Sequence, residues 1–213
     1  MGSIDQVSPP AGGLPPVRPA PLGHRGAVVW LTGLPGSGKT TLARALEQQL
    51  RAGGLKTVVL DGDDLRRGVS QGLGFLLADR RESIRRAAEV ALSLAEAGAV
   101  VLVAHISPLR ESRMLAAERI RERGVPFAEV FVNAPIAVCE QRDPKGLYRK
   151  ARAGQIVSFT GIDSPYDVPT EPDLEIRTDL EPLADCVRKI TPLALKLAEL
   201  QARSGFAEWL AGP

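Results

Sequence analysis

Glycine, lysine and threonine occur in residues 33–40 at a spacing that suits the binding of phosphate groups. Glycines let successive backbone N–H groups approach phosphate oxygens without a Cβ in the way, and a helix that begins here adds its N-terminal dipole. In this eight-residue pattern the lysine reaches the β- and γ-phosphates, and the threonine hydroxyl ligates Mg²⁺. We therefore predict that a nucleoside triphosphate, with Mg²⁺, is bound by Gly33, Leu34, Pro35, Gly36, Ser37, Gly38, Lys39, Thr40 and Thr41.

The flanking sequence supports this prediction over the alternative, a glycine-rich turn that binds nothing. An apolar run, residues 28–31, directly precedes the loop, and an amphipathic run with Leu42, Leu46 and Leu50 directly follows it. A strand, a glycine-rich loop and a helix in that order are the structural context that the phosphate-binding pattern requires. We expect Lys39 to be a catalytic residue and Thr40 to be a metal ligand.

Three aspartates, Asp61, Asp63 and Asp64, follow another apolar run at residues 57–60. We predict that Asp61 orients Mg²⁺ and that Asp63 holds an acceptor hydroxyl, both as catalytic residues. An aspartate with an ordinary pKa near ~3.9 is a weak base, but phosphoryl transfer requires positioning and charge neutralisation more than proton abstraction. The alternative is an Asp-Gly turn whose aspartate caps the next helix. We expect Asp64 to lie at that helix start.

The elements that must position these residues alternate along the chain. Short apolar runs rich in β-branched residues alternate with longer amphipathic runs, which is typical of βαβ units around a parallel sheet. Ligands of such sheets gather at the carboxyl ends of the strands, where both motifs lie. We predict an α/β fold with a five-stranded parallel sheet, helices on both faces, and strands at Ala27–Leu31, Thr57–Leu60, Ala99–Val103, Ala128–Val132 and Asp173–Ile176.

Helices are predicted between these strands. Apolar residues recur at helical spacing from Ile84 to Ala95, and Gly98 ends that stripe. Near the end of the chain, a helix through Ile190 is expected to stop. Thr191 would then cap a further helix, with Pro192 at its first position.

Composition sets limits on the class of protein. The chain has 213 residues and a net charge of +2, which gives no reason to expect nucleic acid or a membrane as a partner. It has no apolar run long enough to span a membrane and no signal-peptide pattern, so we expect a cytoplasmic protein. Its two cysteines, Cys139 and Cys186, are expected to be reduced and partly buried. Residues 1–25, rich in proline and glycine, are expected to form a disordered or loosely ordered tail.

The motifs, in this order, resemble the adenylylsulfate kinase (adenosine 5′-phosphosulfate kinase) family of P-loop proteins from about residue 26 to residue 178. They are GLPGSGKT at 33–40, LDGDDLR at 60–66, GLGF at 72–75, ADRRESIRR at 78–86, HISPLRESR at 105–113 and RDPKGLYRKARAGQIVSFTGIDSPYDVP at 142–169. The last block carries the most information, since many unrelated proteins share the phosphate loop.

The resemblance implies a single kinase domain at residues 26–203, followed by a short tail at 204–213. It implies transfer of the γ-phosphate of ATP, with Mg²⁺ as cofactor, to the 3′-hydroxyl of adenosine 5′-phosphosulfate. The basic segment at 142–160 would form a lid that excludes water, with Arg142 on the ATP side and Lys150 at the phosphates. The implied substrate-binding residues are Asp63, Arg66, Phe75, Arg80, Ser83, Ile106, Ser107, Lys145, Gly146, Leu147, Lys150 and Phe159.

Chemistry makes several of these roles reasonable. Arginine suits forked recognition of oxyanions better than lysine, which fits Arg66 and Arg80. The resemblance implies that Phe75 and Phe159 sandwich the adenine of the acceptor. Because both lie in polar, glycine-flanked segments, we do not expect them to join the core. Ser107 has two open interpretations: it faces the acceptor, or it caps a helix that starts at Pro108.

The sequence departs from the family pattern at several positions. Ser83 stands where the family usually has an asparagine that hydrogen-bonds the acceptor, and His105 stands where Phe or Ala is common. A lone histidine is more often structural than functional. Leu109 and Ser112 replace an aromatic residue and an aspartate. These changes leave open a kinase of the same scaffold that acts on another small alcohol or nucleotide.

A nonenzymatic module that senses nucleotides is a more remote alternative, because Lys39, Thr40, Asp61 and Asp63 are all present. The resemblance further implies a homodimer and functional coupling to a sulfate adenylyltransferase.

Overall fold

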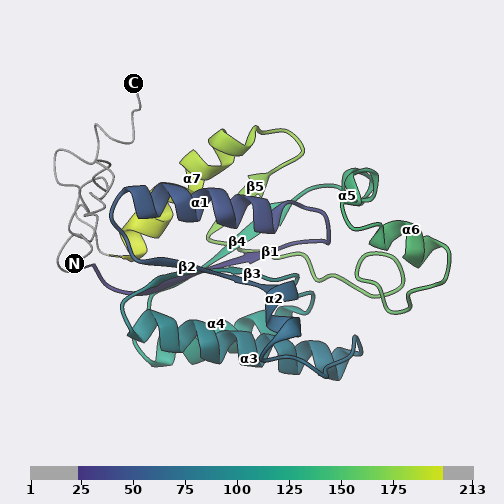
Figure 1. The fold of residues 1–213 in the computed structure, drawn as a ribbon, viewed down its shortest axis with the longest axis horizontal. Coiled ribbons are helices and arrows are strands. Elements are labelled where there is room, and N and C mark those ends of the chain that lie inside the picture. Colours follow the sequence, from purple (N-terminus) through teal and green to yellow (C-terminus); the bar gives the residue numbers. More distant parts are fainter. Residues whose placement is uncertain (1–23, 199–213) are drawn as a thin grey trace, which may run out of the picture.

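A computed structural model describes residues 24–198 of the chain. Five parallel strands form one sheet in the order β2-β3-β1-β4-β5, and helices cover both faces of it (Figure 1). The predicted parallel sheet with helices on both faces is therefore confirmed. The strands are β1 (Ala27–Thr32), β2 (Thr57–Asp61), β3 (Val100–Ala104), β4 (Phe127–Asn133) and β5 (Leu174–Arg177).

Successive side chains of the central strand β1 point to opposite faces of the sheet, so the core consists of two layers. Val29 and Leu31 face the cluster formed with α1 (Lys39–Ala52) and α7 (Leu183–Leu197). Val28 and Trp30 face the opposite cluster, formed with α3 (Leu77–Glu96) and α4 (Arg110–Glu122). Every residue of β1 is buried, as expected for a strand that is covered on both faces.

The path of the chain creates a crevice at the carboxyl edge of the sheet. The loop after β1 leads to α1 on one face, whereas the loop after the neighbouring β3 leads to α4 on the other face (Figure 1). Such a reversal leaves a crevice between the two loops, where ligands of open α/β sheets bind. Leu31 and Asp61 both pair with Ala104, so β2 and β3 end at the same level, one residue before the end of β1.

Shorter helices lie at that edge. The helix α2 (Gly62–Arg67) follows β2 directly, while α5 (Ile136–Arg142) and α6 (Leu147–Arg152) extend beyond the sheet on the right of Figure 1. A small separate cluster, which includes Cys139, Tyr148 and Phe159, packs beneath α5 and α6. The predicted lid segment thus has an apolar core of its own.

The prediction of a helix break at Thr191 is wrong, because α7 continues from Leu183 to Leu197 with Pro192 inside it. Proline lacks an N–H, so the carbonyl four residues earlier loses its helical partner. The carbonyl affected is that of Arg188, and the Thr191 hydroxyl donates to the neighbouring carbonyl of Val187 over 2.8 Å. Pro192 lies on the exposed side, and the buried stripe of Ile190 and Ala194 passes it without interruption.

The predicted tails at 1–25 and 204–213 lie almost entirely outside the described residues. Within residues 24–198, no helix is long and apolar enough to cross a membrane. Both cysteines are free and buried.

Candidate active site

The phosphate loop joins β1 to α1 in a compact turn that only glycine accommodates at its tightest points. Gly36 and Gly38 have φ values of 75° and 97°, in the left-handed region that other residues avoid. A Cβ at Gly36 would lie 2.9 Å from the carbonyl oxygen of Cys139 in α5. The loop is thus built against the base of the lid segment.

Two side chains from other parts of the chain bind backbone carbonyls of the phosphate loop. The Tyr148 hydroxyl of α6 donates to the carbonyl of Pro35 over 3.0 Å, and the Thr178 hydroxyl donates to the carbonyl of Ser37 over 2.7 Å. Arg142 binds the Thr178 carbonyl over 2.6 Å. Sequence reasoning gave neither Tyr148 nor Thr178 a role, although Thr178 directly follows β5, the place where ligand-site residues of such sheets occur.

Lys39 is buried and points back into the loop. Its ammonium donates to the carbonyls of Gly33 and Leu34 over 2.9 and 2.7 Å. Burial lowers the pKa of Lys39 to about 8, while the nearby charges of Cys139 and Asp61 oppose that shift. The ammonium is therefore weakly solvated, and phosphate oxygens that reach it would replace carbonyl partners rather than water.

The Thr40 hydroxyl donates to Oδ2 of Asp61 over 2.6 Å, while Oδ1 of Asp61 accepts the N–H of Asp63 over 2.8 Å. Asp61 thus caps α2, as the alternative interpretation held, and also faces the phosphate loop. A hydroxyl and a carboxylate oxygen are hard donors that suit Mg²⁺, which takes one or two carboxylates and completes its shell with phosphate and water. Among residues 24–198, no group of three or more His, Cys, Asp or Glu side chains is arranged to hold a metal ion.

Asp63 connects the acidic turn to the lid. Its carboxylate forms an ion pair with Lys145, which precedes α6, and both side chains are more than half exposed. Asp64 lies in the first turn of α2, as predicted, and pairs with Arg67.

Arginine and aromatic side chains meet in the same crevice as the phosphate loop. The guanidinium of Arg66 lies 4.4 Å from the centre of the Phe75 ring. Arg80 donates to the Phe75 carbonyl over 2.8 Å and also binds Thr160 and the Ser158 carbonyl of the lid segment. Burial lowers the pKa of both Arg66 and Arg80. The arrangement presents two partly desolvated cations beside an aromatic face.

The two phenylalanines differ in their surroundings. Phe75 is 58% exposed, so its ring is accessible for stacking with a planar ligand. Phe159 is only 8% exposed and packs edge-on against Tyr148 at 5.0 Å, inside the cluster under the lid. The expectation that Phe159 stays out of any core is therefore wrong, although its ring also borders the crevice.

A cavity of about 1150 Å³ extends from the phosphate loop to these aromatic residues. Most of the predicted site residues line it together, although they come from separate parts of the chain. They are Pro35, Gly36, Gly38, Lys39, Thr40, Thr41, Asp61, Asp63, Arg66, Phe75, Arg80, Ile106, Arg142, Lys145, Leu147 and Phe159.

Other predicted residues lie away from the cavity wall. Gly33, Leu34 and Ser37 belong to the phosphate loop but are not part of that wall, and Gly146 caps α6. Lys150 projects from the exposed side of α6. Ser83 is fully buried on α3 behind the wall, 3.4 Å from His105.

Ser107 does not cap a helix, so that interpretation is wrong. The helix α4 starts at Arg110, whose N–H is accepted by Oδ2 of Asp167 over 2.9 Å. Ser107 has a φ of 46° and is fully buried, with its hydroxyl accepting the indole N–H of Trp30 over 2.9 Å. Its side chain is occupied by the protein itself and lies outside the cavity wall.

His105 contributes to the cavity wall, which its sequence context alone did not settle. Nδ1 accepts the N–H of Ser107 over 3.2 Å, which places the proton of the neutral ring on Nε2, beside Ser83. Burial lowers the pKa of His105 to about 4, with a further lowering from Arg66 and Lys39. The ring is therefore neutral near pH 7.

Comparisons with known proteins identify the family of the chain. A family model described as adenylylsulphate kinase matches residues 25–177. The adenylyl-sulfate kinase of Picosynechococcus sp. is 51% identical over 177 residues, covering 83% of this chain and 96% of the relative. That of Geotalea daltonii is 56% identical over 158 residues, covering 73% and 76%.

A solved structure with a similar fold is the Mycobacterium tuberculosis APS kinase in complex with AMPPNP and APS. It is 49% identical, covers 80% of this chain and 98% of its own, and superposes with a TM-score of 0.78. By its motifs, its family match and its close relatives, the chain belongs to the adenylylsulfate kinase family.

Proposed function

We propose that this kinase transfers the γ-phosphate of ATP to the 3′-hydroxyl of adenosine 5′-phosphosulfate, giving 3′-phosphoadenosine 5′-phosphosulfate. One observation carries the proposal: a single cavity is lined both by the phosphate loop and by paired arginines with an aromatic face. Such a cavity suits two nucleotides whose reacting groups meet in the middle, beside Asp61 and Asp63.

The phosphate-loop end would hold the triphosphate. Backbone N–H groups of residues 33–40 bind its oxygens, and the dipole of α1 adds to the attraction. Lys39 exchanges its carbonyl partners for the β- and γ-phosphates, and Arg142 lies on the ATP side near Thr178. Thr40 and Asp61 would hold Mg²⁺, which neutralises charge on the transferring group when bound.

The arginine-rich end would hold the acceptor. The phosphosulfate carries negative charge, which Arg66 and Arg80 can bind in a forked manner. Its adenine would stack on Phe75, the exposed ring, with Phe159 bordering the other side. Both arginines already bind backbone carbonyls of the surrounding loops, so the cations are held in place before the acceptor arrives.

Asp63 would position the acceptor hydroxyl for in-line attack. As an exposed carboxylate it would accept a hydrogen bond from the hydroxyl. As the bond from the 3′-oxygen to the γ-phosphorus forms and the bond to the departing ADP breaks, the hydroxyl proton would pass to Asp63 and from there to solvent, because the loose transition state requires little base strength. Lys145 reaches the same carboxylate from the lid segment, so lid and acidic turn meet where the phosphoryl group passes. Closure there would exclude water that competes for the phosphoryl group.

A coupled assay tests the proposal. Purified protein with Mg²⁺ and ATP should release ADP only when adenosine 5′-phosphosulfate is added, and the 3′-phosphorylated product should appear in equal amount. Lys39→Ala should remove this turnover. Well-folded protein that shows no dependence on adenosine 5′-phosphosulfate would contradict the proposal.

The same assay addresses the alternatives. Turnover with another small alcohol or nucleotide, and not with adenosine 5′-phosphosulfate, would indicate a kinase of the same scaffold with a different acceptor. Tight binding of both nucleotides without product would indicate a sensing module. The family resemblance further leads us to propose one kinase domain at residues 26–203, a cytoplasmic homodimer, and metabolic coupling to a sulfate adenylyltransferase that supplies the acceptor.

A further inference from the structure

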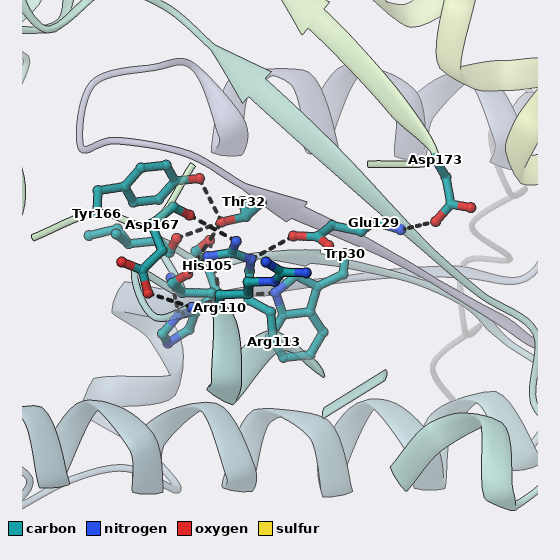
Figure 2. Close-up of polar contacts among 11 residues, drawn as sticks. Trp30, Thr32, His105, Arg110, Arg113, Glu129, Tyr166, Asp167 and Asp173 are labelled. Carbon is teal, nitrogen blue, oxygen red and sulfur yellow. Dashed lines mark hydrogen bonds and ion pairs between the residues drawn. The ribbon is translucent and has the colours of Figure 1, made fainter. Parts of the chain in front are cut away.

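A buried arginine, Arg113 of α4, connects three parts of the chain that are distant in sequence. It is 3% exposed, and all three guanidinium nitrogens donate to oxygens (Figure 2). Nε binds Oε1 of Glu129 over 2.6 Å, Nη1 binds the Ser107 carbonyl over 2.9 Å, and Nη2 binds the Asp167 carbonyl over 2.8 Å. An arginine so buried and fully hydrogen-bonded fixes its partners, because the planar guanidinium allows little change of angle.

A second set of contacts joins the same two segments. The Tyr166 hydroxyl lies 3.0 Å from the Thr32 hydroxyl, which in turn donates to the Ile106 carbonyl over 2.7 Å. The Asp167 N–H donates to the carbonyl of Pro108 over 2.8 Å. Figure 2 shows Tyr166 and Asp167 gathered with Thr32 on the same side of the Arg113 guanidinium. Residues 165–168, named here the lid root, are thus tied to residues 105–108, named the β3–α4 wall.

Both segments lead directly to the cavity. The β3–α4 wall contributes His105, Ile106 and Pro108 to its lining. The chain that enters the lid root contributes Phe159 and Thr160, a few residues earlier. Neither Arg113 nor the lid root itself touches the cavity, so their contacts act through the segments that they hold.

The backbone at the centre of these contacts is in an unfavourable conformation. Ser107 has a φ of 46°, which is uncommon for a residue other than glycine and persists only where the surroundings determine it. Arg113 binds its carbonyl, and Trp30 donates to its hydroxyl. The contacts therefore maintain a shape of the wall that the local backbone would not adopt by itself.

We infer that Arg113 is a positioning residue that fixes the lid root against the β3–α4 wall, so that the lid closes on the acceptor in a set register. The inference rests on the proposed function, because it concerns the acceptor half of the same cavity. The phosphate loop leads to α1, on the face of the sheet opposite α4, and its carbonyls bind Tyr148 and Thr178 rather than Arg113. Loss of the Arg113 contacts should therefore weaken the binding of the acceptor far more than the binding of ATP.

Steady-state kinetics of Arg113→Lys tests the inference. Lysine keeps a positive charge beside Glu129 but cannot donate to both backbone carbonyls in the geometry of the guanidinium fork. We expect the KM for adenosine 5′-phosphosulfate to rise about tenfold or more, with the KM for ATP within about twofold of the wild type. Tyr166→Phe, which removes one hydroxyl from the second set of contacts, should give a smaller change in the same direction.

Hydrogen exchange gives a second measurement that does not depend on turnover. In Arg113→Lys the Asp167 amide, which donates to Pro108, should exchange faster, together with amides of the β3–α4 wall, while those of α1 keep their protection. Arg119→Lys is the matched control, because Arg119 lies on the same helix in an exposed pair with Glu89. It should change neither the kinetics nor the exchange.

The outcomes separate this inference from the proposed function. A wild type without turnover on adenosine 5′-phosphosulfate would contradict the proposed function. An active wild type whose Arg113→Lys variant shows unchanged KM values, or equal rises for both substrates, would overturn the inference alone. A variant that is less stable but has unchanged KM values would show a purely structural role and would overturn it as well.

Discussion

Thr40 donates its hydroxyl hydrogen to Oδ2 of Asp61 over 2.6 Å, which joins the start of α1 to the end of β2. The two residues come from separate motifs, and the register of the strands brings them together, since Leu31 and Asp61 both pair with Ala104. Their oxygens are the pair that we propose for Mg²⁺.

Removal of divalent cations should therefore stop turnover, and loss of either oxygen should weaken it severely. We expect EDTA to abolish activity and Thr40→Val to lower kcat by about a hundredfold, because charge on the transferring phosphoryl group would be less well neutralised. Turnover is measured over a titration of Mg²⁺. Thr170→Val, at an exposed threonine away from the cavity, is the matched control. Full activity of Thr40→Val at limiting Mg²⁺ would contradict the assignment.

The ion pair between Lys145 and Asp63 should matter for activity and not for stability. Both side chains are more than half exposed, and exposed pairs contribute about 0–1 kcal/mol. Lys145→Ala should therefore change the free energy of unfolding by less than about 1 kcal/mol in urea.

The same variant should reduce kcat with adenosine 5′-phosphosulfate by about tenfold or more, because the lid loses its contact at the reacting centre. Arg152→Ala, which breaks the exposed pair with Glu140 on the outer side of α6, is the control and should keep its kcat. If Lys145→Ala retained full turnover, the lid contact would have no part in the reaction.

Local sequence patterns were enough to predict the strands and the phosphate loop. The strands are short apolar runs, and each predicted range differs from the observed one by a residue or two, as for Ala99–Val103 against Val100–Ala104. These patterns are local, because burial on both faces selects residue types within each strand. The loop is equally local, since its glycines and Lys39 act within eight residues.

Contacts between distant segments could not be predicted in this way. In the sequence Arg113 is one of several charged residues on a polar helix, so its burial is not expected. It is buried because Glu129 and Asp167, from other parts of the chain, accept its hydrogen bonds. Phe159 lies in a polar stretch, yet Tyr148 makes it part of a small core. The Thr-Pro pair at 191–192 is typical of a helix start. The apolar stripe of α7 continues through it, however, and packing of that stripe against the core stabilises one uninterrupted helix.

Because His105 is buried, the free energy of unfolding should depend on pH in the acidic range. In the folded protein its pKa is lowered to about 4, first by burial and then by Arg66 and Lys39, while Asp61 and Asp63 act in the opposite direction. The unfolded chain takes up the proton below about pH 6.5 and the folded protein does not until about pH 4. The contribution of His105 to stability is thus unchanged above pH 6.5 and falls as the pH drops from there to 4.

Urea unfolding of the wild type and His105→Gln measures this effect. Between about pH 7.5 and pH 5 the free energy of unfolding should fall by roughly 2 kcal/mol more in the wild type than in the variant. Carboxylates elsewhere contribute equally to both proteins, so their effect cancels in this difference. Parallel pH profiles for the two proteins would show that His105 does not remain neutral in the fold.

Ser83 and His105, both departures from the family pattern, lie 3.4 Å apart, and Ser83 is fully buried with Ser70 at 3.5 Å. The larger side chain of an asparagine at position 83 would have to displace these neighbours. We expect Ser83→Asn to lower the free energy of unfolding by about 1–3 kcal/mol, as overpacking of a core does. It should not raise kcat/KM for adenosine 5′-phosphosulfate, because position 83 lies behind the cavity wall.

The paired change tests whether the two positions depend on each other. In Ser83→Asn with His105→Ala, the smaller side chain at 105 makes room for the amide, so at least about 1 kcal/mol of the loss should be recovered relative to the sum of the single changes. Ser93→Asn, on the exposed side of the same helix, is the control and should stay within about 0.5 kcal/mol. Additive effects of Ser83→Asn and His105→Ala would show that the two positions vary independently. A single Ser83→Asn variant with full stability and higher kcat/KM would place residue 83 in direct contact with the acceptor.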